Sequence, residues 1–180
     1  EDYGLIYKAL STKSRIRPGA KSVDLYWDIS YSMRDRDLTK ELQFLDEYFS
    51  KTRNTKVNLI QFSNAIVSED SFQISGGDWS RLKSALQASV YDGGTSFDKL
   101  FANTKGDEIL LFTDGMRNLS ELKATSDKPH YIINSMGMAN NKRLEDIAAS
   151  TNGVYANLNS KSVSDAISAI MNQSYSFLGY

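Results

Sequence analysis

Three oxygen-bearing side chains follow an apolar run near the start of the chain. Asp28, Ser30 and Ser32 stand at alternate positions directly after the run 23–27, which has the composition of a strand. A carboxylate and two hydroxyls at a strand end are the hard oxygen donors that a small cation such as Mg²⁺ binds. Serine and aspartate are also common in turns and helix caps, so these three residues alone leave both interpretations open.

Two later loops offer further oxygen ligands. Thr95 follows a pair of glycines, which permit backbone angles that bring the next side chain close to a ligand. Asp114 follows the most strand-like run of the chain, 108–113, and precedes Gly115. In a doubly wound sheet, functional loops meet at the carboxyl ends of the strands. The sequence therefore predicts one site with five oxygen side chains, three hydroxyls and two carboxylates.

The composition indicates one globular domain over 1–180, with a lead-in segment over 1–22 and a tail over 174–180. Because the sequence begins at Glu1 rather than methionine, we expect it to be excised from a larger protein. The 21 basic and 22 acidic residues nearly cancel, which gives no overall field for nucleic acid or an anionic membrane. The lack of cysteine excludes disulfides, zinc thiolate sites and thiol catalysis, and a single histidine argues against a His-rich metal site. No apolar run approaches the roughly 20 residues of a membrane span.

Strand-like and helix-like segments alternate along the chain. This alternation predicts an α/β fold, in which helices cover both faces of a doubly wound, mostly parallel, Rossmann-like sheet. A short turn after 56–62 makes the next strand an antiparallel edge strand. Asp37 and Asp78 are the expected N-caps of the first two helices. The lead-in carries several basic residues, Arg17 among them, and is interpreted as a solvated strand and loop. The predicted strands are 23–28, 56–62, 65–74, 108–113, 130–134 and 153–156, and the predicted helices are 37–51, 78–89, 97–103, 119–124, 141–150 and 161–173.

The order of the oxygen ligands resembles a known family. Asp-x-Ser-x-Ser, then a loop threonine, then Asp-Gly is similar to the metal-ion-dependent adhesion site of von Willebrand factor type A (VWA) domains and integrin inserted domains. Asp28, Ser30, Ser32, Thr95 and Asp114 match that pattern residue by residue, and loop order and domain size agree over nearly the whole chain. The runs 91–95, 110–115 and 175–178 also look similar to bacterial proteins that join a vault/inter-alpha-trypsin-inhibitor-type domain to a type A domain.

The resemblance implies a metal-dependent protein-interaction module of the cell-adhesion type rather than an enzyme. It implies Mg²⁺ or Mn²⁺, with Ca²⁺ less expected, held directly by Ser30 and Ser32, by Thr95 directly or through water, and by the aspartates through water. The open coordination position would take a Glu or Asp carboxylate of a partner protein or of another domain of the same chain. We expect no nucleic acid and no membrane contact by the domain itself. The resemblance also favours an extracellular, periplasmic or cell-surface location.

The sequence departs from the family pattern in two places. Tyr31 stands between the serines, where the family often has glycine. Asp35 matches a position that binds a second cation in integrin beta subunits, but Arg36 brings a positive charge to the next position, so we prefer Asp35 and Asp37 as helix N-terminal carboxylates. We interpret Tyr31 and Arg36 as marks of partner choice. A partner-contact rim is expected at Tyr31, Met116 and Arg117, although exposed loop residues need no such role.

Three alternatives stay open. The first is a metal-free type A fold, in which these serines and aspartates serve only as turn and cap residues. The second is a Mg²⁺-dependent hydrolase, which would need a nucleophile or base near the metal, whereas His130 is expected at the opposite end as a structural residue and no phosphate-binding GxxxxGK[ST] loop is present. The third is an internal docking scaffold, in which the metal site binds another domain of the same polypeptide.

Trp27 and Trp79 are interpreted as core residues.

Overall fold

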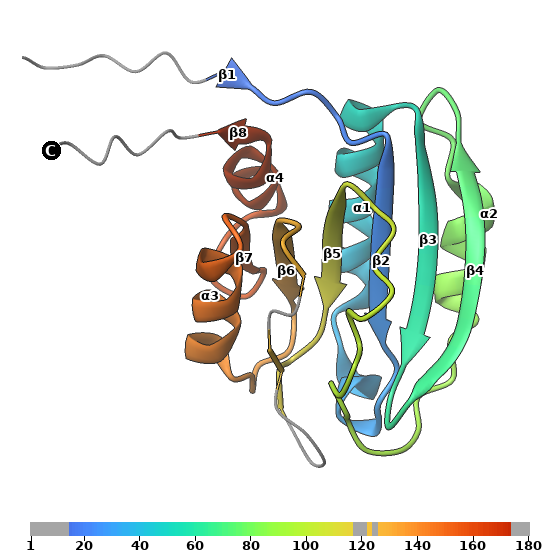
Figure 1. The fold of residues 1–180 in the computed structure, drawn as a ribbon, viewed down its shortest axis with the longest axis vertical. Coiled ribbons are helices and arrows are strands. Elements are labelled where there is room, and N and C mark those ends of the chain that lie inside the picture. The colour runs from blue at the N-terminus through green and yellow to red at the C-terminus, as the bar shows by residue number, and fades with distance from the viewer. Residues whose placement is uncertain (1–14, 117–121, 124–125, 174–180) are drawn as a thin grey trace, which may run out of the picture.

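The computed structural model describes residues 15–116, 122–123 and 126–173, and its main sheet has six strands (Figure 1). The strand order is β4-β3-β2-β5-β6-β7. The β3–β4 pair is antiparallel and the other four neighbouring pairs are parallel. This confirms the predicted mostly parallel sheet with one antiparallel edge strand. The strands are β2 (Ser22–Asp28), β3 (Thr55–Phe62), β4 (Ile66–Ile74), β5 (Glu108–Phe112), β6 (His130–Asn134) and β7 (Val154–Asn157).

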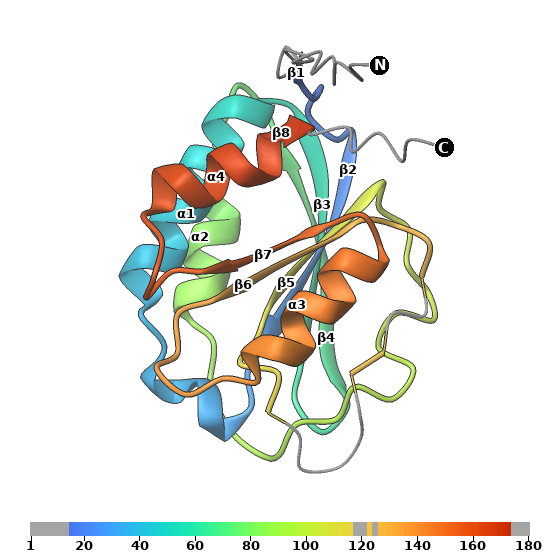
Figure 2. The same ribbon diagram turned by 90° about the vertical axis from the view of Figure 1, so that its left-hand side faces the viewer.

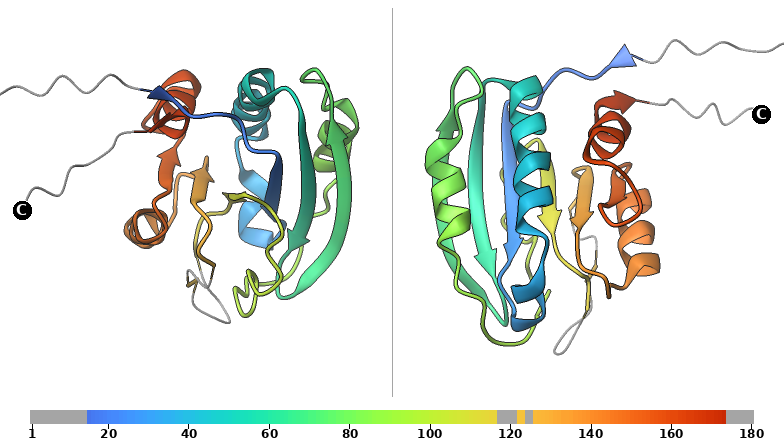
Figure 3. Two further views of the ribbon diagram at one scale, coloured as in Figure 1. Left: turned by 45° about the horizontal axis from the view of Figure 1, so that its top comes forward. Right: turned by 180° about the vertical axis from the view of Figure 1, so that it is seen from behind.

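Helices cover both faces of the sheet, as the alternation of elements predicts. Three helices, α1, α2 and α4, lie on one face, and α3 lies on the other (Figure 2). Seen from behind, α1 crosses the middle of the sheet beside β2 (Figure 3, right). Within the described residues, no helix is long and apolar enough to cross a membrane. The helices are α1 (Leu38–Thr52), α2 (Ser80–Gln87), α3 (Asn141–Ser150) and α4 (Val163–Met171), and a 3-10 turn, η1 (Tyr31–Asp35), precedes α1.

The predicted boundaries of these strands and four helices agree with the structure within two residues at each end. Asp37 is the N-cap of α1, as predicted, because its side chain accepts a hydrogen bond from Lys40 N at 3.0 Å. Asp78 is not the cap of α2. The helix begins later, at Ser80, with Trp79 at the N-cap position, and Asp78 instead accepts a bond from Ser80 N at 3.0 Å in the preceding turn.

The predicted helix over 97–103 is wrong. Its apolar positions Phe97, Leu100 and Phe101 are buried as a helical face would be, but the backbone forms successive turns. Lys99 has a positive φ of 55°, which ends any helix there, and a segment this short gains little from helical hydrogen bonds. Apolar packing against the sheet therefore fixes the segment without a helix. The other short helix, predicted over 119–124, falls largely outside the described residues.

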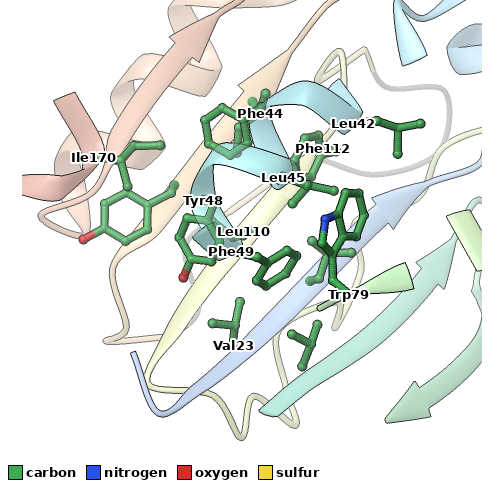
Figure 4. Close-up of a cluster of buried hydrophobic side chains, with 14 of the residues drawn as sticks. Val23, Leu42, Phe44, Leu45, Tyr48, Phe49, Trp79, Leu110, Phe112 and Ile170 are labelled. Atoms are coloured by element: carbon green, nitrogen blue, oxygen red, sulfur yellow. The ribbon is translucent and has the colours of Figure 1, made fainter. Parts of the chain in front are cut away.

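The larger of the two cores lies between the sheet and α1, α2 and α4 (Figure 4). Trp27 of β2 is fully buried there, and its ring lies 4.9 Å from that of Phe112. Trp79 packs against Phe49 of α1 at 5.5 Å. Both tryptophans are core residues, as predicted. Because an aromatic side chain buries about 150–250 Å², this cluster fixes α1, and hence the loop that enters it, against the middle of the sheet.

The lead-in segment is not simply a solvated strand and loop. β1 (Arg15–Ile16) pairs antiparallel with β8 (Asn172–Gln173), which directly follows α4. Arg17 is buried, which corrects the interpretation of a solvated side chain. Its guanidinium forms an ion pair with Glu108, and its Nε donates to the carbonyl of Ile170 at 2.9 Å. A buried cation requires such partners, and they lie too far along the chain for local pattern to indicate them.

Candidate functional site

The loops that hold the predicted ligands meet at one edge of the sheet, where the parallel strands end (lower edge in Figure 1). We call the loops 29–36, 63–65, 88–96, 113–116 and 135–140 the site edge. Two backbone hydrogen bonds of 2.9 Å join the first of these loops to the third, from Asp92 N to Ile29 O and from Tyr31 N to Gly93 O. Gly93 has a φ of +77°, a backbone conformation that L-residues rarely adopt. The glycine therefore allows the turn that brings Thr95 to this edge.

Asp28 ends β2 and is fully buried. Its Oδ1 accepts a hydrogen bond from Ser30 N at 2.9 Å, and its Oδ2 accepts one from Thr113 Oγ1 at 2.6 Å. Burial raises the pKa of the Asp28 carboxyl, the bonds from Ser30 and Thr113 act in the opposite direction, and the negative charge of Asp114 adds to the increase. The bond from Thr113 joins Asp28 to the loop that bears Asp114, so the two carboxylates belong to adjoining segments.

The two serines present their hydroxyls together. Ser30 Oγ lies 3.2 Å from Ser32 Oγ. Ser30 has an extended backbone, and Ser32 lies in the η1 turn that begins directly after it. Ser30 is buried and Ser32 is exposed, so the pair reaches from the interior of the edge to solvent. Two adjacent hydroxyl oxygens of this kind are suitable ligands for a hard cation.

Thr95 has a buried hydroxyl without a hydrogen-bond partner among the described residues. The hydroxyl of Thr113, also at the site edge, differs: it donates to Asp28 and accepts from Gly115 N at 3.1 Å. Burying a polar atom without a hydrogen-bond partner destabilises the folded state by about 1–3 kcal/mol. A ligand that binds the atom would offset this cost. The Thr95 hydroxyl is therefore suited to coordinate a metal ion.

Asp114 is buried at the end of β5. Its Oδ1 accepts a hydrogen bond from Met116 N at 2.8 Å, which fixes the carboxylate in the turn. Its backbone carbonyl accepts a bond from Asn140 N at 2.8 Å, which joins this loop to the start of α3. All five predicted ligands thus belong to three adjoining loops. In the described part of the chain, nowhere do three or more acidic or histidine side chains gather as a metal centre, so a cation here would depend on the hydroxyls.

Arg36 is buried rather than placed on the rim, which corrects the interpretation of this residue as a determinant of partner choice. Its Nε donates to Glu41 Oε2 at 2.6 Å, and its Nη1 donates to the carbonyl of Asp28 at 2.8 Å. The guanidinium lies 3.7 Å from the centre of the Trp27 ring. The other carboxylate oxygen of Glu41 accepts a bond from Ser135 Oγ at 2.7 Å. This network fixes the end of β2 against α1 and the loop after β6.

Sequence reasoning did not identify Glu41. A signal exists, because Glu41 lies in the apolar stripe of α1 together with Leu42 and Leu45, where a solvated carboxylate is not expected. Asp35 does not occupy the first turn of α1. It ends η1, and its side chain accepts a bond from Arg34 Nε at 3.3 Å.

The expected partner-contact rim is partly described. Tyr31 is 54% exposed between the two serines, and Met116 is 41% exposed two residues after Asp114. The guanidinium of Arg34 lies 4.3 Å from the centre of the Tyr31 ring and also donates to its hydroxyl. Arg117 lies outside the described residues. His130 lies at the opposite edge, buried at the start of β6, with Nδ1 2.6 Å from the carbonyl of Lys128.

Comparisons with known proteins find similarity in structure alone. No protein family matches the sequence, and no curated protein is similar to it by sequence. An aerotolerance-related membrane protein from Bacteroides fragilis NCTC 9343 is similar in structure, with a TM-score of 0.60, 19% identity, and coverage of 83% of this chain and 96% of that chain. The BatB protein from Bacteroides thetaiotaomicron has a TM-score of 0.58 and 17% identity, over 82% of this chain and 94% of that chain.

A third structure names the type of domain. The von Willebrand factor type A protein from Catenulispora acidiphila matches with a TM-score of 0.54 and 15% identity, over 83% of this chain and 40% of that chain. At these identities the similarity concerns the fold. The chain therefore has a VWA-like fold, as the resemblance in its sequence implies.

Proposed function

We propose that this domain is a metal-dependent protein-interaction module of the adhesion type. It binds a divalent cation, Mg²⁺ or Mn²⁺, and through it an acidic residue of a partner protein or of another domain of the same polypeptide. The observation that supports this proposal most is the buried hydroxyl of Thr95, which lacks a hydrogen-bond partner in the described structure and shares its edge with the hydroxyls of Ser30 and Ser32.

The donor set favours a hard cation that keeps a net positive charge. Ser30, Ser32 and Thr95 are neutral ligands, and they would hold the ion directly. Asp28 and Asp114 are each committed to hydrogen bonds with neighbouring groups, so their carboxylates act best from the outer sphere of the ion. When bound, the cation supplies a positive charge that attracts an external carboxylate.

The same residues argue against a hydrolase. A metal-dependent hydrolase needs a base or nucleophile beside the ion. Here the serines serve as ligands, and Glu41, a further buried carboxylate near this edge, is committed to the guanidinium of Arg36 and to Ser135. The single histidine lies at the far edge. We therefore propose binding without turnover.

Isothermal titration of the protein with Mg²⁺ tests the proposal. We expect binding in the wild type, and binding weakened about tenfold or more in Ser32→Ala, because the exposed hydroxyl can be removed without disturbing the core. The matched control is Asp146→Ala on α3, which removes an exposed carboxylate paired with Lys142 and should leave the titration unchanged. Equal binding in Ser32→Ala and wild type would contradict the proposed site, and Mg²⁺-dependent hydrolysis of a phosphate ester would contradict the proposed class.

A further inference from the structure

In the part of the chain that the structure describes, the exposed large apolar side chains lie at one edge of the sheet. Six such side chains occur in the described part of the chain, and each belongs to the site edge or to the strand start beside it. Three follow the ends of β2, β5 and β6, one lies in the loop after α2, and two begin β4, which runs back from the end of β3. They are Tyr31, Ile66, Val67, Val90, Met116 and Met138.

Hydrogen bonds join the segments that bear these side chains. Ser96 N donates to the carbonyl of Ser63 at 2.8 Å, which joins the loop of Thr95 to the turn before β4. Gln61 Nε2 donates to Ser89 Oγ at 2.6 Å, directly before Val90. These bonds add to those that join the same loop to the segment of Tyr31. The apolar side chains therefore stand on one connected set of loops around the candidate metal ligands.

A neighbouring arginine contacts Tyr31 and fixes its orientation. Tyr31 stands between the two serine ligands, and the guanidinium of Arg34 contacts both its ring face and its hydroxyl. An aromatic side chain that is fixed before binding loses little conformational entropy when a partner covers it, and tyrosine is common among the residues that dominate binding energy at interfaces. Met116 and Met138 add flexible apolar surface that can adapt to a partner.

The partner's chemistry follows from this arrangement, if the proposed cation site is correct. Exposed apolar surface that is concentrated in one place marks an interaction site. With a cation between the loops, the centre of the edge is positive, and exposed apolar side chains lie on the loops around it. We propose that the partner is a protein segment whose acidic residue is flanked by large apolar residues, which pack on Tyr31, Val90, Met116 and Met138. This inference rests on the proposed function and specifies the ligand of that same site.

Fluorescence anisotropy with three labelled peptides tests the inference on the full chain. The first peptide has a central Glu flanked on both sides by Leu, the second has the same Glu flanked by Ser, and the third has Gln in place of Glu between the leucines. We expect the Leu-flanked Glu peptide to bind about tenfold more tightly than the Ser-flanked one in Mg²⁺. We also expect its binding to be lost in EDTA and in the Gln peptide.

The other outcomes separate the inference from the proposed function. Equal, Mg²⁺-dependent binding of both Glu peptides would overturn the apolar preference and leave the proposed function intact. Binding of the Leu-flanked peptides that persists in EDTA would also overturn the inference, because the apolar surface would then act without the cation. If no peptide binds in a Mg²⁺-dependent way while Mg²⁺ itself still binds, the partner carboxylate of the proposed function is contradicted.

A surface variant makes the same test from the side of the protein. The double variant Val90→Ser/Met138→Ser changes two side chains that are 79% and 76% exposed, so it should fold and bind Mg²⁺ as the wild type does. We expect it to lose most of the tenfold preference for the Leu-flanked peptide. The matched control is Lys56→Ser, an exposed position at the start of β3 on the opposite edge, which should keep the preference. An unchanged preference in the double variant would overturn the inference.

Discussion

The two edges of the sheet are built from similar parts but serve different purposes. Each contains a buried ion pair between an arginine and a glutamate: Arg36–Glu41 at the site edge and Arg17–Glu108 at the opposite edge, which we call the closed edge. At the closed edge the hydroxyl of Tyr48 also donates to Glu108, and the guanidinium of Arg17 lies 4.6 Å from the centre of the Tyr131 ring. The closed-edge pair thereby joins α1, β5 and β6 to the lead-in.

The difference between the edges lies in what surrounds each pair. Both edges contain buried hydroxyls without a hydrogen-bond partner in the described structure, such as Thr52 and Thr55 at the closed edge, so a hydroxyl of this kind is not in itself a site. At the site edge, the loop of Thr95 adjoins the segments that bear two buried carboxylates and the exposed hydroxyl of Ser32. The convergence of donors, with access to solvent, distinguishes a candidate metal site from tight packing.

Two glycines differ in how closely other atoms pack around them. Gly153, at the closed edge before β7, faces the backbone of His130 so closely that an added Cβ would lie 1.9 Å from its carbonyl oxygen. Gly137, at the site edge, has no atom within 4 Å of such a Cβ. Gly76, at the closed edge, is equally open, so this contrast is local to Gly153 and Gly137.

The largest effect that we predict comes from breaking either ion pair. Glu108→Ala and Glu41→Ala each leave a buried guanidinium without its carboxylate, and each should lower the free energy of unfolding by about 3–5 kcal/mol. Only Glu41→Ala should also weaken Mg²⁺ binding, because Arg36 then no longer fixes the carbonyl of Asp28. Urea denaturation and Mg²⁺ titration of the folded fraction measure the two effects. Weaker Mg²⁺ binding in Glu108→Ala would break the comparison.

A smaller effect concerns the pH dependence of the closed edge. Burial lowers the pKa of His130, and the contact with the carbonyl of Lys128 opposes this only in part. The folded state therefore binds the proton less readily than the unfolded state, so His130 contributes stability above about pH 6.5 that is lost as the pH falls through its lowered folded pKa. Urea denaturation at several pH values should show a smaller loss of stability on acidification in His130→Phe than in the wild type. An identical pH profile in the variant would contradict this assignment.

Much of the candidate site is predictable from sequence because its signals are local. Asp28, Ser30 and Ser32 lie within five residues, and Asp114 directly follows an unmistakable strand. The fold is predictable for a related reason: strand and helix periods alternate over most of the chain, and the buried apolar runs of β5 and β6 allow few other assignments. The segment 97–103 has the apolar spacing of a helix but is not one. Successive turns bury its three apolar side chains as well as a helix would, so the spacing does not determine the backbone conformation.

The buried charges are not predictable in the same way. Arg17 and Glu108 are 91 positions apart, and in the sequence both have the appearance of solvated residues. Arg36 stands beside exposed Asp35, yet its side chain turns inward toward Glu41. Which charged side chain is buried depends on contacts between elements that only the folded chain brings together. The partner surface is predictable only in part. The sequence shows that its side chains lie in loops, but only the strand order shows that these loops meet at one edge.

Two buried threonines of the site edge provide the most direct test of the central claim, that Thr95 belongs to a cation site. Thr95→Val removes a hydroxyl without a hydrogen-bond partner, whereas Thr113→Val removes one that donates to Asp28 and accepts from Gly115. Without Mg²⁺, Thr113→Val should cost about 1–3 kcal/mol of unfolding free energy, and Thr95→Val should cost nothing or stabilise the fold slightly.

The decisive measurement is the stabilisation of Thr95→Val by Mg²⁺. At a Mg²⁺ concentration 100-fold above the wild-type Kd, ligand binding should raise the unfolding free energy of the wild type by about 2.7 kcal/mol. In Thr95→Val, affinity should fall about tenfold or more, so this stabilisation should shrink by about 1.3 kcal/mol or more. Equal stabilisation of Thr95→Val and the wild type by Mg²⁺ would contradict the account.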